Sequence, residues 1–400
     1  MAKLARRDGA VKQTRQLTDY FYDPKVRGIL FQVIVVALIS WLVYGAVLNT
    51  VNNLEAQGIA SGFGFLDRTA GFDISQSLIP YENTMTYARA FWVGLLNTLL
   101  VAVLGIVFAT TVGFMIGAAR LSQNWLIAQL ATAYVEILRN LPPLLMLFAV
   151  YFGVLKTLPS PRESLALPFS SYLNSRGLYV PAVHWEPGFG VVVASLFVAA
   201  ICVIAYWAWA RWRHTQTGRQ MPILLPSLGV IVGIPLLAFL LMGMPLSFDP
   251  PVQGRFNLTG GIALLPELIA LLVGLALYTS AFIAEIVRAG IMGVPTGQRE
   301  AAAALGLKPG QILWLVVFPQ AMRIIIPPLT NQYLNLTKNS SLAVAIGYPD
   351  LVSVFAGTVL NQTNQAVEVI LITMSVYLVL SLLTSLFMNW FNQRMALVER

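Results

Sequence analysis

Residues 300–319 have the sequence EAAAALGLKPGQILWLVVFP and lie between two long apolar runs. The first six are good helix formers, and Gly306 can end that helix because glycine tolerates the left-handed backbone of a C-terminal cap. Pro309 suits the first turn of a second helix, which should run on until Pro319. With the Val-Pro-Thr-Gly turn that opens it, the stretch 294–319 predicts a short helix, a sharp corner and a second short helix at a membrane surface.

The composition indicates an integral membrane protein. Hydrophobic residues make up 57% of the chain and charged residues only 10%, whereas a soluble domain carries about 25% charged residues. The formal charge of +8 fits basic cytoplasmic loops, so we do not expect nucleic-acid binding. The single cysteine lies in an apolar run and the two histidines are far apart, so we expect no disulfide and no metal site.

Eight apolar runs reach the length of about 20 residues that a membrane span needs. The third is too long for one straight span and contains Pro142-Pro143, so we expect it to follow the membrane surface and then turn inward. Small residues such as Gly113 and Gly117 in the second run would let another helix approach closely. The expected spans are Ile29–Leu48, Phe91–Ala118, Trp125–Leu155, Gly188–Ala210, Ile223–Gly243, Pro266–Gly290, Arg323–Ile346 and Ala366–Phe391.

The distribution of charge predicts the topology. Most of the 25 Lys and Arg residues lie in segments that these spans place on one side, and cytoplasmic loops collect such residues. We therefore expect an all-α, polytopic membrane protein with about eight transmembrane helices and both termini cytoplasmic. The expected organisation is a basic cytoplasmic tail (1–28), the first span with an outside loop (29–89), the first half of a core (90–155), an insertion with an outside segment and two extra spans (156–263), the second half of the core (264–391) and a cytoplasmic tail (392–400).

One motif connects the chain to a known family. Glu300-Ala301-Ala302, then Gly306, then Val316-x-Phe318-Pro319 resembles the EAA loop of ABC importer permeases. The flanking stretches 284–291, 319–323 and 338–342 resemble the polar amino-acid branch of that family, and the resemblance covers roughly residues 90–155 and 264–391. It implies a type I ABC importer permease core with extra helices, in the bacterial inner membrane.

The resemblance also implies a function and a set of partners. The chain would be a permease subunit of a general L-amino-acid importer, translocating substrate that a periplasmic amino-acid-binding protein delivers. Its other partners would be a homologous second permease, two ATPase subunits and the lipid bilayer. The chain has no phosphate-binding loop of the form G-x-x-x-x-G-K-[ST], so we expect no catalytic residue and no cofactor in it, with ATP and Mg held by the ATPase subunits. The ATPase-docking role falls on Glu300, Ala301, Ala302, Gly306 and Leu307.

The seventh span is unusually polar. A charge within a span is costly and is usually paired or functional, which directs attention to Lys338. An amino acid needs donors for its carboxylate and acceptors for its ammonium group, and this span offers both. The alternative is a buried Lys338 that pairs with Glu285, Glu136 or a helix end. The candidate substrate-path residues are Asn331, Asn335, Lys338, Ser340 and Ser341.

Two acid–base pairs lie near the cytoplasmic ends of spans. Glu136 and Arg139 are three residues apart, as are Glu285 and Arg288, and this spacing places each pair on one helix face. They predict either structural salt bridges between helices or subunits, or a cytoplasmic gate that opens and closes.

Three further alternatives remain at the level of sequence. An ion-gradient-driven secondary transporter would also use broken helices and a deep lysine, although it would need no EAA loop. A membrane enzyme would need a His-rich cluster, paired catalytic carboxylates or a nucleophile elbow, and none is apparent. The outside segment 156–187 could contact the binding protein or could merely be a spacer before the two extra spans.

Overall fold

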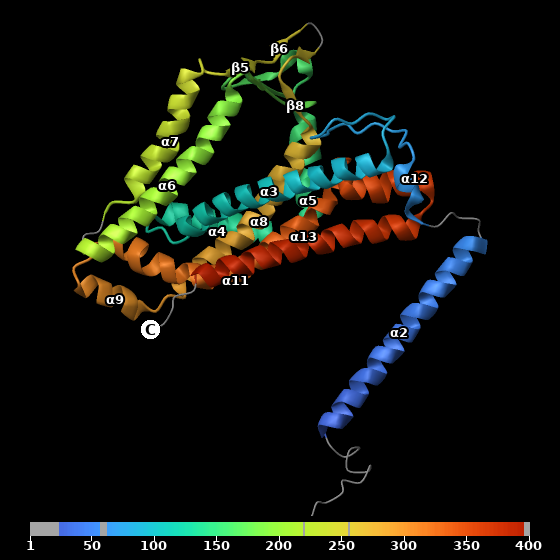
Figure 1. Ribbon diagram of the computed structural model, residues 1–400, viewed down its shortest axis with the longest axis horizontal. Coiled ribbons are helices and arrows are strands. Elements are labelled where there is room, and N and C mark those ends of the chain that lie inside the picture. Colours follow the sequence, from blue (N-terminus) through green and yellow to red (C-terminus); the bar gives the residue numbers. More distant parts are fainter. Residues whose placement is uncertain (1–23, 57–61, 219–220, 255–256, 396–400) are drawn as a thin grey trace, which may run out of the picture.

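The computed structural model describes residues 24–56, 62–218, 221–254 and 257–395 (Figure 1). Most of the expected N-terminal tail lies outside these residues. Within them, seven helices are long and apolar enough to cross a membrane, or eight if a bent pair counts as one further span. The prediction of a helical protein with about eight spans is therefore confirmed.

The centre of the molecule is the packing of α3 (Tyr87–Ala119) against α8 (Pro266–Met292). A methyl group on Gly113 would lie 2.6 Å from the Ile283 side chain, and one on Gly117 would lie 2.8 Å from the Ala284 carbonyl. The two helices therefore approach as closely as the small residues predicted. Over half of the apolar window of α8 is buried, more than in any other described span, so α8 is the helix around which the bundle is built.

The third apolar run is bent at Pro142-Pro143. The chain bends by 110° between its two arms, residues 125–139 and 143–157, where the prolines predicted a break. Asn124 caps the first arm by accepting hydrogen bonds from the Leu126 and Ile127 amides at 3.0 and 3.3 Å. The elements are α4 (Trp125–Arg139), α5 (Pro143–Phe148), the π-helical η2 (Ala149–Val154) and the 3-10 turn η3 (Leu155–Thr157).

The stretch 294–319 forms a helix and a corner, but its second helix does not end at Pro319. The chain stays helical from Pro309 to Ile346 as a single span of 38 residues. A proline removes one backbone hydrogen bond and crowds the preceding turn, and here a π-helical turn lies directly before it. The elements are α9 (Thr296–Ala304), α10 (Pro309–Ile312), η5 (Leu313–Val317), α11 (Phe318–Asn339) and the 3-10 helix η6 (Ser340–Ile346).

After η6 the chain reverses at Gly347, whose φ is +77°, and enters a short helix before the last span. The reversal is fastened to α3, because the Asn97 side chain donates to the Pro349 carbonyl at 2.8 Å and the Leu351 amide donates to the Thr98 hydroxyl at 3.0 Å. The elements are the π-helical η7 (Val352–Val359), α12 (Leu360–Thr363) and α13 (Ala366–Met395).

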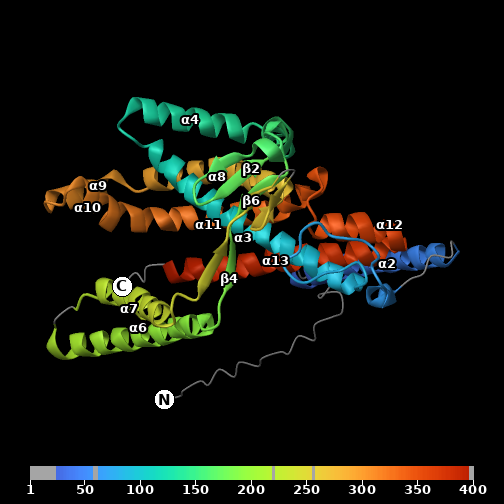
Figure 2. The same ribbon diagram turned by 90° about the horizontal axis from the view of Figure 1, so that it is seen from above.

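The insertion differs from the sequence expectation, because its outside part contains strands. Strands β1 to β4 precede a helical hairpin of α6 (Phe189–Thr217) and α7 (Leu224–Leu241), and β5 to β8 follow it (Figures 1 and 2). Sheets form in the orders β1-β2-β3-β8, β4-β5 and β6-β7, so pairing joins segments on both sides of the hairpin. We name these eight strands the cap: β1 (Leu165–Leu167), β2 (Ser171–Asn174), β3 (Gly177–Val180), β4 (Ala182–Trp185), β5 (Leu246–Asp249), β6 (Val252–Gln253), β7 (Leu258–Thr259) and β8 (Ile262–Leu264).

The first span, α2 (Pro24–Ala56), is longer than expected and stands apart from the bundle (Figure 1). None of its apolar window is buried. The segment between α2 and α3 returns to the bundle, because the Gly62 amide donates to the Glu368 carboxylate at 2.6 Å. Two short 3-10 turns complete the described elements: η1 (Phe63–Asp67) and η4 (Pro161–Glu163).

Candidate functional site

The corner between α9 and α10 is a defined helix-ending motif. Gly306 has a φ of +78°, its amide donates to the Ala303 carbonyl at 2.9 Å, and the Leu307 amide donates to the Ala302 carbonyl at 3.3 Å. These two bonds form a Schellman motif, which needs a residue with left-handed backbone at the position of Gly306. The expectation for Gly306 is confirmed, and the angle at the corner is fixed by backbone geometry.

The helix–corner–helix presents small and polar side chains outward, together with the large apolar side chain of Leu305. Of the expected docking residues, Glu300, Ala301 and Gly306 are exposed, Leu307 is half-buried and Ala302 is buried. Beside them, α8, α9, α10 and η5 border an open hollow of about 660 Å³ that Glu300 helps to line. This surface is tied to α8, because the Arg299 guanidinium donates to the Ile291 carbonyl at 2.7 Å.

Glu300 lies further along its helix than the sequence suggested. A carboxylate in the first turn of a helix is stabilised by the helix dipole, and the start of the EAAAAL run at Glu300 would place it there. Because α9 begins at Thr296, Glu300 is its fifth residue and the first turn holds no acidic residue. The dipole therefore explains Glu300 poorly, and its exposed position leaves the carboxylate free to meet another molecule.

A small polar cavity of about 260 Å³ lies where the bent pair, α8 and α11 meet. Three amide side chains of α11 line it, and their helical spacing places them on one face of that helix. A threonine and two aromatic side chains of α8 also line it, as does a proline at the bend. The lining residues are Pro143, Tyr278, Thr279, Phe282, Gln332, Asn335 and Asn339.

Only Asn335 of the expected substrate-path residues lines this cavity. Lys338 and Ser341 face a different groove of about 640 Å³ along α13. The Ser340 and Ser341 hydroxyls each donate at 2.7 Å to a carbonyl three residues earlier in the same helix. Asn331 is exposed and lines neither space. Gln332, Asn339 and Thr279 were not predicted from the sequence as cavity residues, although the spacing of Gln332, Asn335 and Asn339 indicates their shared face.

Lys338 forms no ion pair among the described residues and is exposed on the surface of this chain. It therefore does not pair with Glu285 or Glu136. Ser341, Thr373 and Tyr377 help to line the groove beside it. A charged lysine at this depth is costly in contact with lipid tails, so we expect this face of the chain to contact protein or water instead.

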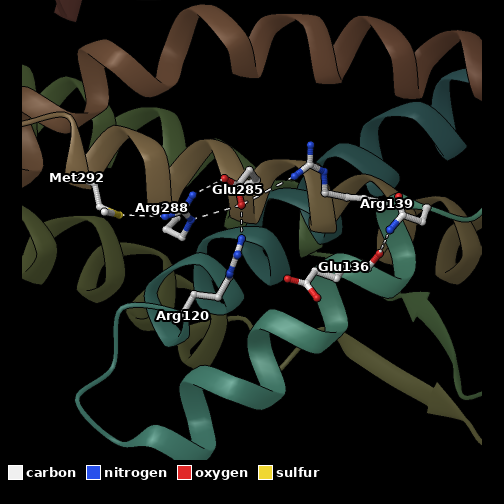
Figure 3. Close-up of polar contacts among 7 residues, drawn as sticks. Arg120, Glu136, Arg139, Glu285, Arg288 and Met292 are labelled. Atoms are coloured by element: carbon white, nitrogen blue, oxygen red, sulfur yellow. Dashed lines mark hydrogen bonds and ion pairs between the residues drawn. The ribbon is translucent and has the colours of Figure 1, made fainter.

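A cluster of charges connects α3, α4 and α8 (Figure 3). The Glu285 carboxylate accepts a hydrogen bond from Arg120 and another from Arg288 at 2.6 Å, and it lies 3.9 Å from a guanidinium nitrogen of Arg139. Arg139 also stacks on the Phe282 ring at 5.4 Å, and Phe282 lines the polar cavity. Three cations share one carboxylate, so the cluster depends on Glu285.

The pairing of Glu136 with Arg139 that the spacing suggested does not form. Arg139 reaches across to α8, whereas the Glu136 side chain is exposed and has no ion pair among the described residues (Figure 3). The pairing of Glu285 with Arg288 is present. Arg120, at the end of the second span, is the member that the sequence analysis missed, and an unpaired basic residue at a span end was its only signal.

A metal site would need a group of ligating side chains, and none is present in the part of the chain that the structure describes. There, no three His, Cys, Asp or Glu side chains gather in a way that could hold a metal ion. Cys202 is exposed on α6 and has no disulfide.

Comparisons with known proteins match nearly the whole chain. A family model described as binding-protein-dependent transport system inner membrane component matches residues 215–397. The general L-amino acid transport system permease protein AapQ of Rhizobium johnstonii is 56% identical over 379 residues, which cover 95% of this chain and 94% of AapQ. The putative amino-acid ABC transporter permease protein YhdX of Escherichia coli is 52% identical over 387 residues, covering 95% and 97%.

A third relative extends the same pattern. The glutamate/glutamine/aspartate/asparagine transport system permease protein BztB of Rhodobacter capsulatus is 41% identical over 420 residues, covering 96% of this chain and 97% of BztB. Because each alignment covers almost the full length of both chains, it includes the cap and the α6–α7 hairpin as well as the bundle.

Proposed function

The chain belongs to the family of binding-protein-dependent transport system inner membrane components, the permeases of ABC importers, and we propose that its substrates are L-amino acids. It is a multi-pass protein of the inner membrane. The proposed substrate class rests on the names of the three relatives, each an amino-acid permease. Broken helices are also compatible with an ion-gradient-driven secondary transporter, but the relatives favour the ABC permease over that alternative.

The proposed partners are a homologous second permease, two ATPase subunits and a periplasmic amino-acid-binding protein. ATP and Mg²⁺ would be held by the ATPase subunits, and this chain would bind neither. Both termini and the α9–α10 corner would then lie in the cytoplasm. The alternation of basic and less basic loops along the sequence supports that orientation.

The ATPase would dock at the α9–α10 corner. Ala301 and Gly306 are exposed and small, so a partner surface can approach the backbone closely, and Glu300 offers a carboxylate at the same surface. The Schellman motif at Gly306 supports a fixed docking angle, because both helices are held by backbone hydrogen bonds. Leu305, next to the glycine, is 83% exposed and would supply an apolar contact.

One observation carries this proposal: the helix that begins at the corner is the helix that lines the polar cavity. From Pro309 the chain is helical without interruption past Asn335, about 40 Å at 1.5 Å per residue. A displacement of the corner by a nucleotide-driven partner would therefore move Gln332, Asn335 and Asn339 together. This coupling supports alternating access, in which the two permeases open a central path first outward and then inward.

The polar cavity has the chemistry for a passing amino acid. The amides of Gln332, Asn335 and Asn339 can donate to a carboxylate and accept from an ammonium group, and Thr279 adds a hydroxyl. We assign Lys338 to a different part of the path, the face toward the second permease, because an exposed charge at that depth needs a polar neighbour. Ser340 and Ser341, whose hydroxyls donate to carbonyls of the same helix, would then be structural, and Asn331 would lie outside the path.

The charge cluster would act as the inner gate. Arg139 is its weakest member at 3.9 Å, and it is the member that lies against the cavity through Phe282. A substrate carboxylate that leaves the cavity would compete with Glu285 for this guanidinium. The cluster would close again when the carboxylate has passed.

Purification of this chain with its associated subunits, followed by reconstitution in liposomes, tests the proposal. We expect a stoichiometric ATPase, and amino-acid uptake that requires ATP and the binding protein. Asn335→Leu should reduce uptake by at least about tenfold without loss of the ATPase, since it removes an amide that lines the cavity and could bond to the substrate. Lys338→Ala tests the second face: unchanged assembly and transport would exclude Lys338 from the path. Uptake by this chain alone would refute the proposal.

A further inference from the structure

The cap carries an exposed aromatic side chain on an unusual turn. The loop between β1 and β2 consists of Pro168, Phe169 and Ser170, and the last two have φ values of +58° and +51°. Bulky residues rarely adopt the left-handed backbone conformation, for which glycine or asparagine is the usual choice. The side chain of Phe169 is nevertheless 91% exposed. A turn that is unfavourable for its sequence and buries nothing suggests selection for another contact.

Phe169 borders a hollow of about 570 Å³ in the cap. Phe248, on β5, lies across it and is 64% exposed, and two prolines complete the apolar lining. The lining residues are Phe169, Ser170, Pro181, Phe248 and Pro250. No lining residue is charged, so the hollow fits an apolar side chain of another molecule.

The cap is positioned to transmit a contact to the bundle. Its four-stranded sheet ends with β8, and two residues after Leu264 the chain enters α8 (Figure 1). The contact between β3 and this junction is tight, since a methyl group on Gly177 would lie 2.1 Å from the Leu264 carbonyl oxygen. At its other end, α8 carries Glu285 and the charge cluster.

The position of the cap also indicates which partner it meets. The cap lies at the N-terminal end of α8, whereas α9 follows the C-terminal end, on the opposite side of the bundle (Figure 1). If α9 and α10 meet the ATPase, the cap is outside the cell membrane. The family is described as dependent on a binding protein, and in the proposed function that protein is the soluble partner on the outer side.

We propose that the β1–β2 turn and the facing β5 strand form a docking site for the extracytoplasmic binding protein, with Phe169 and Phe248 as its aromatic anchors. This inference rests on the proposed function. The partner surface would present an apolar side chain to the hollow between the two rings, inside a polar rim. Aromatic side chains that fill such pockets often dominate the affinity of an interface.

The test uses the complete complex of both permeases and the ATPases in nanodiscs. The readout is the concentration of binding protein that gives half-maximal stimulation of ATP hydrolysis. Phe169→Asn removes the ring and suits the left-handed turn better, so the cap should stay folded. We expect Phe169→Asn and Phe248→Ser each to raise this concentration about tenfold, as for a truncated hot spot. Val252→Ser, at an exposed cap position that does not line the hollow, should leave it unchanged.

A second measurement separates the binding protein from the bilayer as the partner. An environment-sensitive fluorophore attached to Phe169→Cys in a Cys202→Ser background, labelled before assembly, should shift its emission to shorter wavelength only when the binding protein is added. A shifted emission that brominated lipids quench before any protein is added would overturn the proposal in favour of membrane insertion. If the Phe169→Asn complex is still stimulated and its half-maximal concentration of binding protein is unchanged, the docking site is refuted but the proposed function is not. A complex without an ATPase would overturn the proposed function as well.

Discussion

Gly306→Ala should weaken ATPase binding although the added methyl group meets no neighbour. Nothing lies within 4 Å of that methyl position, so the cost comes only from the φ of +78°. A left-handed backbone costs a non-glycine residue about 1–2 kcal/mol. The free corner would relax from its Schellman geometry, and docking would have to restore it. Since about 1.4 kcal/mol corresponds to a factor of ten, we expect the dissociation constant of the ATPase to rise about 5- to 30-fold.

Gly310→Ala is the matched control. This position also has open space for a methyl group, but it lies inside α10 with an ordinary φ, where alanine favours the helix by about 1 kcal/mol. The dissociation constant of the ATPase from the Gly310→Ala permease should stay within about twofold of the wild-type value. The assay is titration of the nanodisc-embedded permease pair with labelled ATPase, with thermal unfolding of each variant measured in parallel. Equal effects of the two substitutions, or none, would refute the role of the fixed corner.

Two further substitutions, each with a control, test the bundle. Glu285→Gln leaves three guanidinium groups without their shared carboxylate, so the free energy of unfolding should fall by about 2 kcal/mol, a value discounted for partial exposure. Glu136→Gln should change it by less than about 0.5 kcal/mol, because this side chain is exposed and unpaired among the described residues. Gly113→Leu should lower the thermal midpoint through its clash with Ile283, at a cost of about 1–3 kcal/mol, whereas Gly45→Leu has open space and should be neutral. A neutral Glu285→Gln or Gly113→Leu would contradict the packing described.

The local features of the site were predictable from the sequence. The end of α9 at Gly306 follows from glycine chemistry, and the bend in the third apolar run follows from Pro142-Pro143. Both depend on a few neighbouring residues. Pro319 shows the limit of this reasoning, because a π-helical turn lets the helix continue through a residue that usually ends one.

The features that join distant segments were not predictable. The contact of Arg120 with Glu285 spans 165 residues, and no local pattern specifies which arginine Glu285 meets. The pairing of β3 with β8 likewise crosses the whole α6–α7 hairpin. The depth of Lys338 along its helix was apparent from sequence, but its face was not. That face depends on how α11 rotates against α8 and α13.

Accessibility of the α9–α10 corner tests the central claim most directly. Leu305→Cys, in a Cys202→Ser background that removes the chain's only other thiol, places one reactive group on an 83% exposed position. We predict that a membrane-impermeant maleimide labels it in inside-out vesicles but not in right-side-out vesicles, and that bound ATPase subunits protect it. Labelling from the outer side, or labelling that the ATPase leaves unchanged, would contradict the account.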